Sequence, residues 1–323
     1  MSRRELWFTG PERVELRSAP AAPLGAGQVR ARALASGISQ GTELLLYQGE
    51  GPTPFDPSLD APAAPTYPRR YGYAWVGEVI ESKSDALGLG ARVFALLPHG
   101  DEHCLGAEQA RLLPHDVPAE RAVLAANLET AINVVWDAGI ALGDQVVVIG
   151  GGIVGLLSGY LAKRSGAGRV CLIEPSALRL RAALGLGFDE AWSPEAPRAL
   201  AADVVIEASG NPACLEPALA LARDEGVIVV ASFYGQRVAA LPLGSDFHRR
   251  RLTLKASQVS RLPATRVGWS FERRFALVCD LLENPLLDAL LETPVPFDEA
   301  PASYARLARA PGATLQTVFR YQR

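Results

Sequence analysis

The segment QVVVIGGGIVGLLSGYLAKRSGAGRVCLIE, residues 145–174, decides the fold. It begins with the β-branched run VVVI, which is typical of a strand buried in a parallel sheet. The pattern Gly150-x-Gly152-x-x-Gly155 follows at once and opens an apolar stretch with helical spacing. A second short apolar strand then ends on Glu174. This order of strand, glycine-rich turn, helix and strand predicts the βαβ unit of a Rossmann nucleotide-binding site.

Each glycine has a physical role in such a site. Gly150 permits the tight turn, Gly152 lets the backbone approach a pyrophosphate, and Gly155 lets the helix pack close to the sheet. The helix N-terminus, at Ile153 and Val154, presents unpaired N–H groups and the positive end of its dipole to phosphates. The alternative is a glycine turn that serves packing only, or a Rossmann-like sheet with a different ligand.

Glu174 bears on the choice of coenzyme. It follows Gly155 by 19 residues, and at the end of the second strand it can accept hydrogen bonds from the adenine ribose hydroxyls. Its charge repels a 2′-phosphate, so NAD(H) is the expected coenzyme. Arg179 and Arg181 lie just beyond it and would meet a 2′-phosphate if the loop turned, which keeps NADP(H) open.

The composition describes an ordinary globular chain. Its 323 residues, of which 49% are hydrophobic, suggest two domains with a core each. A net charge of −3 favours neither nucleic acid nor an anionic membrane as a partner. We expect no signal peptide and no membrane span, because no long apolar run is present. The four cysteines are scattered without a CxxC pair, which predicts free thiols and a cytoplasmic location.

The secondary-structure pattern changes along the chain. Residues 1–125 read as short strands and loops, with a proline-dense loop at 49–70 and no helix of normal length before about residue 118. Strands and helices then alternate up to about residue 262, and a helix at 270–285 and a final strand at 315–323 follow. The fold class predicted is α/β, a doubly wound parallel sheet joined to a mainly-β domain.

The whole chain resembles the medium-chain dehydrogenase/reductase superfamily, the group of zinc-type alcohol dehydrogenases and quinone oxidoreductases. Within it, the pairing of GTE with GYxxVG is similar to a subgroup that includes bacteriochlorophyllide hydroxyethyl dehydrogenases. The segments that carry the resemblance are ASGISQGTE (35–43), YGYAWVGEV (71–79), ALGLGARVFAL (86–96), NLETAINVV (127–135), ASFYGQ (231–236) and LTLKASQ (252–258).

The resemblance implies a nicotinamide-dependent oxidoreductase with a split catalytic domain. Residues 1–125 and 263–323 would form a GroES-like mainly-β catalytic domain, residues 126–262 would form the Rossmann domain, and the active site would lie in the cleft between them. A homodimer is the expected assembly. The further coenzyme-binding residues that it implies are Thr130, Arg179, Ser209, Gly210, Ser232, Phe233, Tyr234, Ser257 and Gln258.

The zinc ligands of the family are missing from this sequence. Its catalytic zinc is held by a Cys, a His and a Cys or Glu, and these positions correspond here to Ser39 or Gln40, to Tyr73 and to Ala126. Of the cysteines that hold a structural zinc, only Cys104 lies in the corresponding region. Hydroxyl, amide and methyl groups do not make a zinc site, so we predict a zinc-independent protein with no metal.

A second metal site could lie in PHGDEHC, residues 98–104. His99 and His103 are four residues apart with acidic neighbours. Pro98 and Gly100 break any helix that would align the two imidazoles, so we expect a solvated polar loop instead.

Without zinc, a hydroxyl group must donate the proton or hydrogen bond that stabilises the substrate oxygen. Tyr73 is the leading candidate, with a structural aromatic side chain as the alternative. Thr42 aligns with the hydroxyl that relays protons in zinc members. Ser39 and Gln40 could bind a carbonyl oxygen, and Glu43 could orient Tyr73 or a backbone group.

The helix that enters the coenzyme domain carries the remaining candidates. Asn127 and Glu129 fall where the nicotinamide end is expected, and Thr130 aligns with the residue that packs on the ring. Helix capping or a salt bridge is the alternative role for Glu129.

The lack of a Lewis acid favours reduction of an activated C=C bond, in an enone or an enoyl thioester such as an enoyl-CoA, because a developing enolate needs only hydrogen bonds and a proton. The alternatives are a secondary alcohol dehydrogenase or ketone reductase, and a catalytically silent NAD(H)-binding sensor or assembly protein. The arginine-rich segment 249–274 could bind phosphates of the coenzyme or of an acyl-CoA, or be a solvated face paired with carboxylates.

Overall fold

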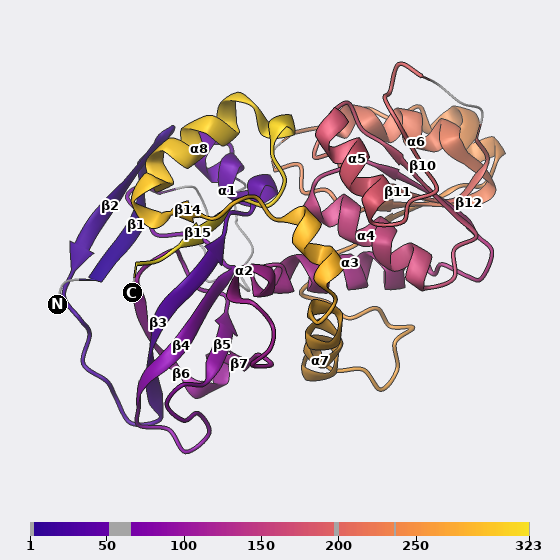
Figure 1. Cartoon of the computed structure of the whole chain (residues 1–323). Coiled ribbons are helices and arrows are strands. Elements are labelled where there is room, and N and C mark those ends of the chain that lie inside the picture. Colours follow the sequence, from indigo (N-terminus) through magenta and orange to yellow (C-terminus); the bar gives the residue numbers. More distant parts are fainter. Residues whose placement is uncertain (1–2, 52–65, 197–199, 236, 323) are drawn as a thin grey trace. The chain divides into compact units, whose positions relative to one another are not determined.

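The computed structural model describes residues 3–51, 66–196, 200–235 and 237–322. The chain divides into two compact units (Figure 1). Unit 1 contains Met1–Ala126 and Ala276–Arg323, and unit 2 contains Asn127–Phe275. Most of the predicted proline-dense loop lies outside the described residues.

Unit 2 is built on a six-stranded parallel sheet, and this sheet is the predicted Rossmann fold. The order β10-β9-β8-β11-β12-β13 reverses direction after β10, so β8 and β11 flank a topological switch point. The strands are β8 (Gln145–Ile149), β9 (Arg169–Ile173), β10 (Glu190–Trp192), β11 (Ala202–Glu207), β12 (Ala222–Val230) and β13 (Thr253–Ala256).

Helices cover both faces of this sheet. The crossover connections place α4 (Ile153–Arg164) and α5 (Ala177–Gly185) on one face and α6 (Leu215–Leu221) on the other. The pleat of β8 agrees with this arrangement, because its alternate residues Val147 and Ile149 share a core cluster with residues of α6. α3 (Ala125–Ala138) leads the chain into the unit.

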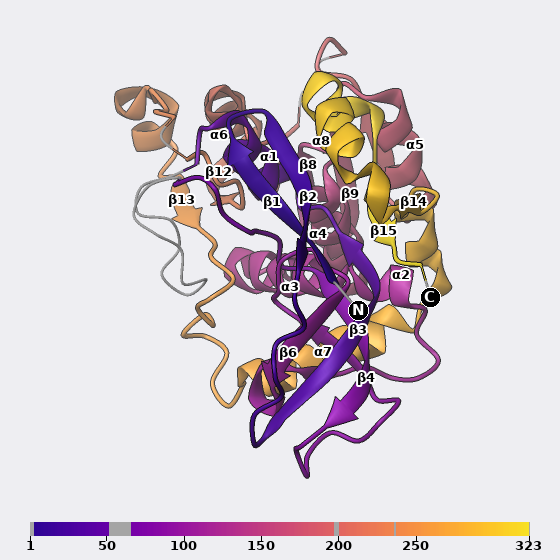
Figure 2. The same ribbon diagram turned by 90° about the vertical axis from the view of Figure 1, so that its left-hand side faces the viewer.

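Unit 1 is mainly β, as predicted. A seven-stranded sheet has the order β14-β15-β3-β4-β5-β7 with β6 also paired to β3, and a separate hairpin joins β1 to β2 (Figure 2). The strands are β1 (Arg3–Gly10), β2 (Arg13–Ala19), β3 (Gln28–Gly37), β4 (Trp75–Ser82), β5 (Arg92–Ala95), β6 (Glu102–Gly106), β7 (Arg111–Leu112), β14 (Val295–Pro296) and β15 (Val318–Arg320).

The prediction that no ordinary helix precedes residue 118 was wrong. α1 (Gln40–Gln48) is a nine-residue helix that ends at Gly49 in the left-handed conformation, with φ of 78°. Its apolar run LLLY is too short to show helical periodicity, but it packs into the unit 1 core, whose contacts stabilise the helix. The other helices of this unit are α2 (Ala119–Ala122), α8 (Ala300–Arg309) and most of α7 (Phe271–Leu282).

The core of unit 1 is rich in tyrosine. Tyr304 on α8 lies edge-on to Phe8, with ring centroids 5.2 Å apart, and stacks on Tyr47 at 5.7 Å. Tyr71 belongs to the same cluster, and Tyr73 packs against it. These aromatic side chains carry hydroxyl groups into the core, where each needs a hydrogen-bond partner.

The boundary between the units falls thirteen residues later than the predicted position at 262, because one buried arginine ties the following segment to α3. Arg274 is 2% exposed. Its guanidinium donates to Glu129 Oε1 at 3.1 and 3.2 Å, to Asn133 Oδ1 at 2.7 Å and to the Val259 carbonyl at 2.8 Å. The Asn133 amide in turn donates to the Arg261 carbonyl at 2.6 Å.

Replacing this arginine is expected to destabilise unit 2 strongly. Arg274→Met removes the cation that faces the buried Glu129 carboxylate, and breaking such a pair costs about 3–5 kcal/mol of unfolding free energy. Urea unfolding followed by tryptophan fluorescence measures it. Arg273→Met is the matched control, because Arg273 is exposed and stacks on Trp269 at 4.1 Å, a contact of about 0.5–1 kcal/mol. Equal losses for the two variants would contradict the expectation.

Candidate functional site

The glycine-rich turn between β8 and α4 is shaped by backbone contacts. Gly150 has φ of 98°, and a Cβ on it would lie 2.5 Å from Ser209 Cα. A Cβ on Gly155 would lie 2.0 Å from the Gly150 carbonyl oxygen. A Cβ on Gly152, by contrast, would meet nothing within 4 Å. Two glycines therefore allow close packing, and the third borders open space.

This open space lies at the N-terminus of α4. Gly152 is the N-cap and provides no side-chain hydrogen bond, while Ile153 and Val154 in the first turn are only partly buried. The free N–H groups of a first helical turn bind phosphate oxygens, and the helix dipole adds to this attraction. The turn therefore fits the pyrophosphate of a dinucleotide.

Glu174 lies against the same turn. Its side chain is nearly buried, with Oε2 accepting the Gly151 N–H at 2.6 Å and Oε1 accepting the Ser176 N–H at 2.9 Å. Arg179 Nη1 lies 3.8 Å from Oε2, and burial lowers the pKa of its guanidinium. Each carboxylate oxygen keeps a second lone pair for a ribose hydroxyl. The hydrogen bonds from the two backbone N–H groups fix the position of the Glu174 carboxylate. Glu174 and Arg179, both predicted coenzyme-binding residues, therefore lie next to each other.

A buried carboxylate that the sequence did not indicate lies at the C-terminal end of the neighbouring strand, β11, and binds several groups there. Glu207, at the end of β11, is fully buried and accepts the Ser209 N–H at 2.8 Å, the Ser209 hydroxyl and the Tyr234 hydroxyl. Burial and the Glu207 carboxylate raise the pKa of Tyr234. Gly210 N–H donates to Ser232 Oγ at 2.8 Å. Four of the predicted coenzyme residues are thus linked in one network.

The other predicted coenzyme residues lie at separate places in unit 2. Phe233 is half exposed. Ser257 donates to Asp137 Oδ2 at 2.8 Å, and the Gln258 carbonyl accepts from the Asn133 amide at 3.0 Å. Asn127 and Thr130 lie partly exposed on α3.

Glu129 pairs with the buried Arg274, whose guanidinium donates to its Oε1. It is itself only 3% exposed. This is the salt-bridge role that the sequence left as its alternative.

Three hydroxyl groups come together in unit 1. The Tyr73 hydroxyl is hydrogen-bonded to Ser39 Oγ and lies 3.2 Å from Thr42 Oγ1. Burial raises the pKa of the Tyr73 phenol, against the opposing effect of these two hydrogen bonds. The phenol therefore stays protonated at neutral pH and can donate. We call Ser39, Thr42 and Tyr73 the hydroxyl triad.

Gln40 does not join the hydroxyl triad. Its amide nitrogen donates to Thr314 Oγ1 at 2.9 Å and to the Leu315 carbonyl at 2.6 Å. Of the two residues that could correspond to the family's cysteine, the one whose side chain contacts Tyr73 is Ser39.

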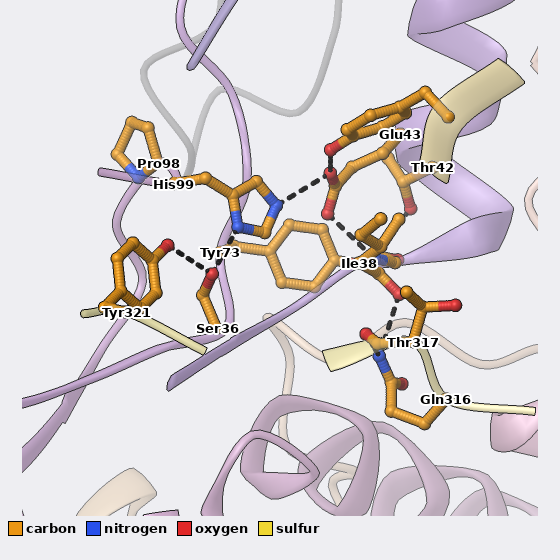
Figure 3. Close-up of polar contacts among 12 residues, drawn as sticks. Ser36, Ile38, Thr42, Glu43, Tyr73, Pro98, His99, Gln316, Thr317 and Tyr321 are labelled. Carbon is orange, nitrogen blue, oxygen red and sulfur yellow. Dashed lines mark hydrogen bonds and ion pairs between the residues drawn. The ribbon is translucent and has the colours of Figure 1, made fainter. Parts of the chain in front are cut away.

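Glu43 and His99 form a buried pair beside the triad (Figure 3). His99 Nε2 lies 3.0 Å from Glu43 Oε2, and the exposed fractions of the two residues are 1% and 0%. The Tyr304 hydroxyl donates to the same Oε2, and Glu43 Oε1 accepts the Ser39 N–H at 2.8 Å. Of the two targets predicted for Glu43, the backbone group is therefore the one it contacts.

The prediction of a solvated loop at 98–104 was wrong. Both histidines are buried, with His103 6% exposed, 5.1 Å from the Trp75 ring centroid and 2.9 Å from the Pro98 carbonyl. Burial lowers the pKa of His103 to about 4, so it is neutral at physiological pH. The segment is drawn inward because β6 pairs with β3 and Trp75 donates to the Gly100 carbonyl at 3.0 Å.

Comparison with known proteins agrees with the fold. The family described as zinc-binding dehydrogenase matches residues 154–270. The chain is 28% identical to D-guloside 3-dehydrogenase of Escherichia coli K12 over 309 residues, which cover 86% of this chain and 88% of that protein. It is 28% identical to scyllo-inosose 3-dehydrogenase of Thermotoga maritima over 208 residues, covering 58% and 50%. These similarities support the resemblance to the medium-chain dehydrogenase/reductase superfamily that the sequence predicts.

Solved structures of this superfamily share its fold. A Sinorhizobium meliloti 1021 protein described as a zinc-binding dehydrogenase and bound to NADP superposes with a TM-score of 0.82 at 21% identity, over 99% of both chains. L-idonate 5-dehydrogenase of Escherichia coli gives a TM-score of 0.82 at 19% identity, over 99% of this chain and 98% of that one. As the resemblance implies, this chain is an NAD(P)-dependent oxidoreductase. The bacteriochlorophyllide-type subgroup does not appear among these relatives.

The residues at the family's catalytic zinc position do not fit the ion. Two of the three positions hold the neutral hydroxyls of Ser39 and Tyr73, which are bonded to each other, and the third holds the methyl group of Ala126. Glu43, the nearest carboxylate bonded to this group, already accepts three hydrogen bonds. Among residues 3–51, 66–196, 200–235 and 237–322, no three His, Cys, Asp or Glu side chains are grouped as metal ligands.

Part of the arginine-rich segment 249–274 pairs with carboxylates, the alternative that the sequence left open for it. Arg250 binds Asp224 at 3.0 Å, Arg251 binds Glu225 at 2.6 Å, and Lys255 lies 3.0 Å from Asp137. These carboxylates neutralise the cations that they pair with, and an acyl-CoA phosphate site here stays a prediction. No helix in the described part of the chain is long and apolar enough to cross a membrane.

Proposed function

We propose that the protein is a zinc-independent secondary alcohol dehydrogenase, or ketone reductase in the reverse direction, for a small polyhydroxylated substrate. The observation that carries the proposal is the hydroxyl triad, in which the Tyr73 phenol and the Ser39 hydroxyl occupy two positions that correspond to zinc ligands of the family, and the Thr42 hydroxyl lies beside the phenol. The relatives support the reaction class, because they are named for the oxidation of hydroxyl groups on a guloside and on an inosose. Neither is named for the reduction of a C=C bond, so the enone and enoyl reading is set aside.

The proposed coenzyme is NAD(H). When bound, a nicotinamide dinucleotide exchanges a hydride with the carbinol or carbonyl carbon of the substrate. The turn at Gly152 and the N–H groups of α4 would hold its pyrophosphate, and Glu174 would accept the adenine ribose hydroxyls. The anchored carboxylate of Glu174 disfavours a 2′-phosphate, although Arg179 beside it moderates that repulsion.

The chain's own part in the reaction is proton transfer at the substrate oxygen. In ketone reduction the Tyr73 O–H bond breaks, and its proton goes to the oxygen as hydride reaches the carbon. Ser39 and Thr42, which contact the phenol oxygen, stabilise the phenolate that results by donating to it. In alcohol oxidation the same phenolate takes the proton back. Because its pKa is raised, the Tyr73 phenol stays protonated at neutral pH and has a proton to give in ketone reduction.

The proposal extends to the architecture. Unit 1 would be the GroES-like catalytic domain and unit 2 the coenzyme domain, with the boundary at the buried Arg274 network rather than at residue 262. A homodimer follows from the resemblance, and light scattering measures it.

A substrate screen tests the function. Purified protein is assayed with NADH and NADPH against hydroxyketones and keto-sugars, then enones and enoyl thioesters, each with and without a metal chelator. We expect turnover with a hydroxyketone, preference for NADH, and no loss of rate in chelator. Turnover of enones alone would overturn the reaction, and loss of rate in chelator that added zinc restores would overturn zinc independence. Binding of NADH without any turnover would favour a silent sensor.

A further inference from the structure

The N-terminus of α1 is capped in an unusual way, and this frees a hydroxyl for the triad. Ser39 is the N-cap residue, a position where a serine hydroxyl ordinarily accepts a first-turn N–H. Here it makes no capping bond, and its oxygen contacts Tyr73 instead. Glu43, one turn into the helix, reaches back to accept the Ser39 N–H at 2.8 Å. The carboxylate thus fixes the backbone of the residue whose hydroxyl contacts the phenol.

Glu43 is in turn held by His99. An ionised carboxylate only accepts hydrogen bonds, so His99 Nε2, 3.0 Å away, must carry its proton and donate. In the neutral ring Nδ1 must then accept, and the Ser36 hydroxyl lies 2.7 Å from it. Ser36 therefore donates its hydroxyl proton to the bond with Nδ1. Its oxygen accepts a hydrogen bond from the Tyr321 hydroxyl, which lies 2.6 Å away. With a neutral imidazole, the donor and the acceptor of each hydrogen bond from Tyr321 through Ser36 and His99 to Glu43 are therefore defined.

His99 also fills the space behind the segment that carries Tyr73. Gly72 has φ of 127°, and a Cβ on it would lie 2.8 Å from His99 Cδ2. No other residue type fits between this backbone and the imidazole without a shift. The ring therefore contacts both sides of the triad: the Ser39 side through Glu43, and the Tyr73 side through Gly72. Figure 3 shows the His99 ring beside Tyr73, with dashed lines to Glu43 and Ser36.

We propose that His99 is a positioning residue for the proton transfer: through Glu43 and Gly72 it sets the Ser39 hydroxyl against the Tyr73 phenol. The inference rests on the proposed function, in which Tyr73 exchanges the proton. Tyr304, the other donor to Glu43 Oε2, shares the same work. No sequence pattern indicates this role, because 56 positions separate His99 from Glu43 and 261 separate Tyr304 from it.

Two phenylalanine substitutions within residues 98–104 provide the test. His99→Phe keeps an aromatic ring in the core but removes the donor to Glu43 and the acceptor for Ser36. His103→Phe is its matched control, since His103 is equally buried but bonds only to the Pro98 carbonyl among the partners measured. We expect His99→Phe to lower kcat about 10- to 100-fold, as a misplaced reacting group does, with the KM for NADH unchanged. His103→Phe should keep kcat within about twofold.

A spectroscopic readout separates positioning from folding and does not need turnover. In protein labelled with ¹³C at tyrosine Cζ, the Tyr73 resonance is assigned by its loss in Tyr73→Phe. We expect His99→Phe to shift this resonance and its titration midpoint, and His99→Gln, whose amide both donates and accepts, to restore them in part. His103→Phe should leave both unchanged.

If His99→Phe does not fold, Tyr304→Phe replaces it, because this variant keeps the ring and removes only one donor to Glu43. A kcat loss with an unmoved Tyr73 resonance, or equal effects of His99→Phe and His103→Phe, would overturn the proposal. If the wild type turns over no substrate, the proposed function fails, while a Tyr73 resonance that still responds to His99 shows that the positioning is real.

Discussion

Tyr73→Phe is expected to lower kcat for ketone reduction by about 10²- to 10⁴-fold, the range that a positioned acid contributes to proton transfer. The phenyl ring keeps the contact with Tyr71, whose ring centroid lies 6.2 Å away, so the core should fold normally. The dissociation constant for NADH should stay within about twofold, because the glycine-rich turn belongs to unit 2. Steady-state kinetics and NADH fluorescence quenching measure the two quantities.

The pH dependence gives a second check on Tyr73. Burial raises the pKa of this phenol above its usual value of about 10, so wild-type reduction should hold constant through neutral pH and fall only in the alkaline limb. Alcohol oxidation should instead rise with pH, because it needs the phenolate. Tyr73→Phe should lose both limbs. An unchanged kcat in this variant would remove Tyr73 from the mechanism and leave it as a structural aromatic side chain.

Gly155→Ala is expected to weaken NADH binding by at least about 100-fold, which is about 2.7 kcal/mol. The new methyl group would lie 2.0 Å from the Gly150 carbonyl oxygen, a backbone atom that cannot rotate away. Either α4 moves off the sheet or the turn changes shape, and both displace the N–H groups proposed to hold the pyrophosphate. Isothermal titration with NADH measures the loss.

Gly185→Ala serves as the control for this substitution. Gly185 ends α5, and a Cβ on it would meet nothing within 4 Å. Alanine there should leave NADH binding unchanged and raise the unfolding free energy by about 0.4–1 kcal/mol, since it reduces the entropy of the unfolded chain. If Gly155→Ala bound NADH as tightly as this control, the glycine turn would have no part in the coenzyme site.

The two halves of the site differed in how far sequence could predict them. The turn at Gly150, Gly152 and Gly155 could be placed in advance because all its parts lie in one strand–turn–helix unit. The hydroxyl triad could be anticipated only through the family resemblance, which aligned Ser39 and Tyr73 with zinc ligands. Composition and periodicity carry no information about two side chains that come from different segments.

Two positions show how the burial of groups that look polar along the chain escapes sequence patterns. PHGDEHC resembles a solvated loop until the pairing of β6 with β3 draws both histidines inward. Glu129 resembles a site residue on the helix entering the coenzyme domain, but the buried Arg274, 145 positions later, takes its carboxylate. Each of these outcomes depends on a partner that is remote in sequence.

The sequence by itself determined the Rossmann unit at 145–174, because strand, turn and helix there are specified by residues in contact with their own neighbours along the chain. Only the tertiary structure decided which side chains stand behind the hydroxyl triad. Glu43 could be assigned a general orienting role from its place in the GTE segment, but its partners His99 and Tyr304 lie on a loop and on α8. A buried carboxylate must find donors wherever folding brings them, and that choice is made by packing, not by local pattern.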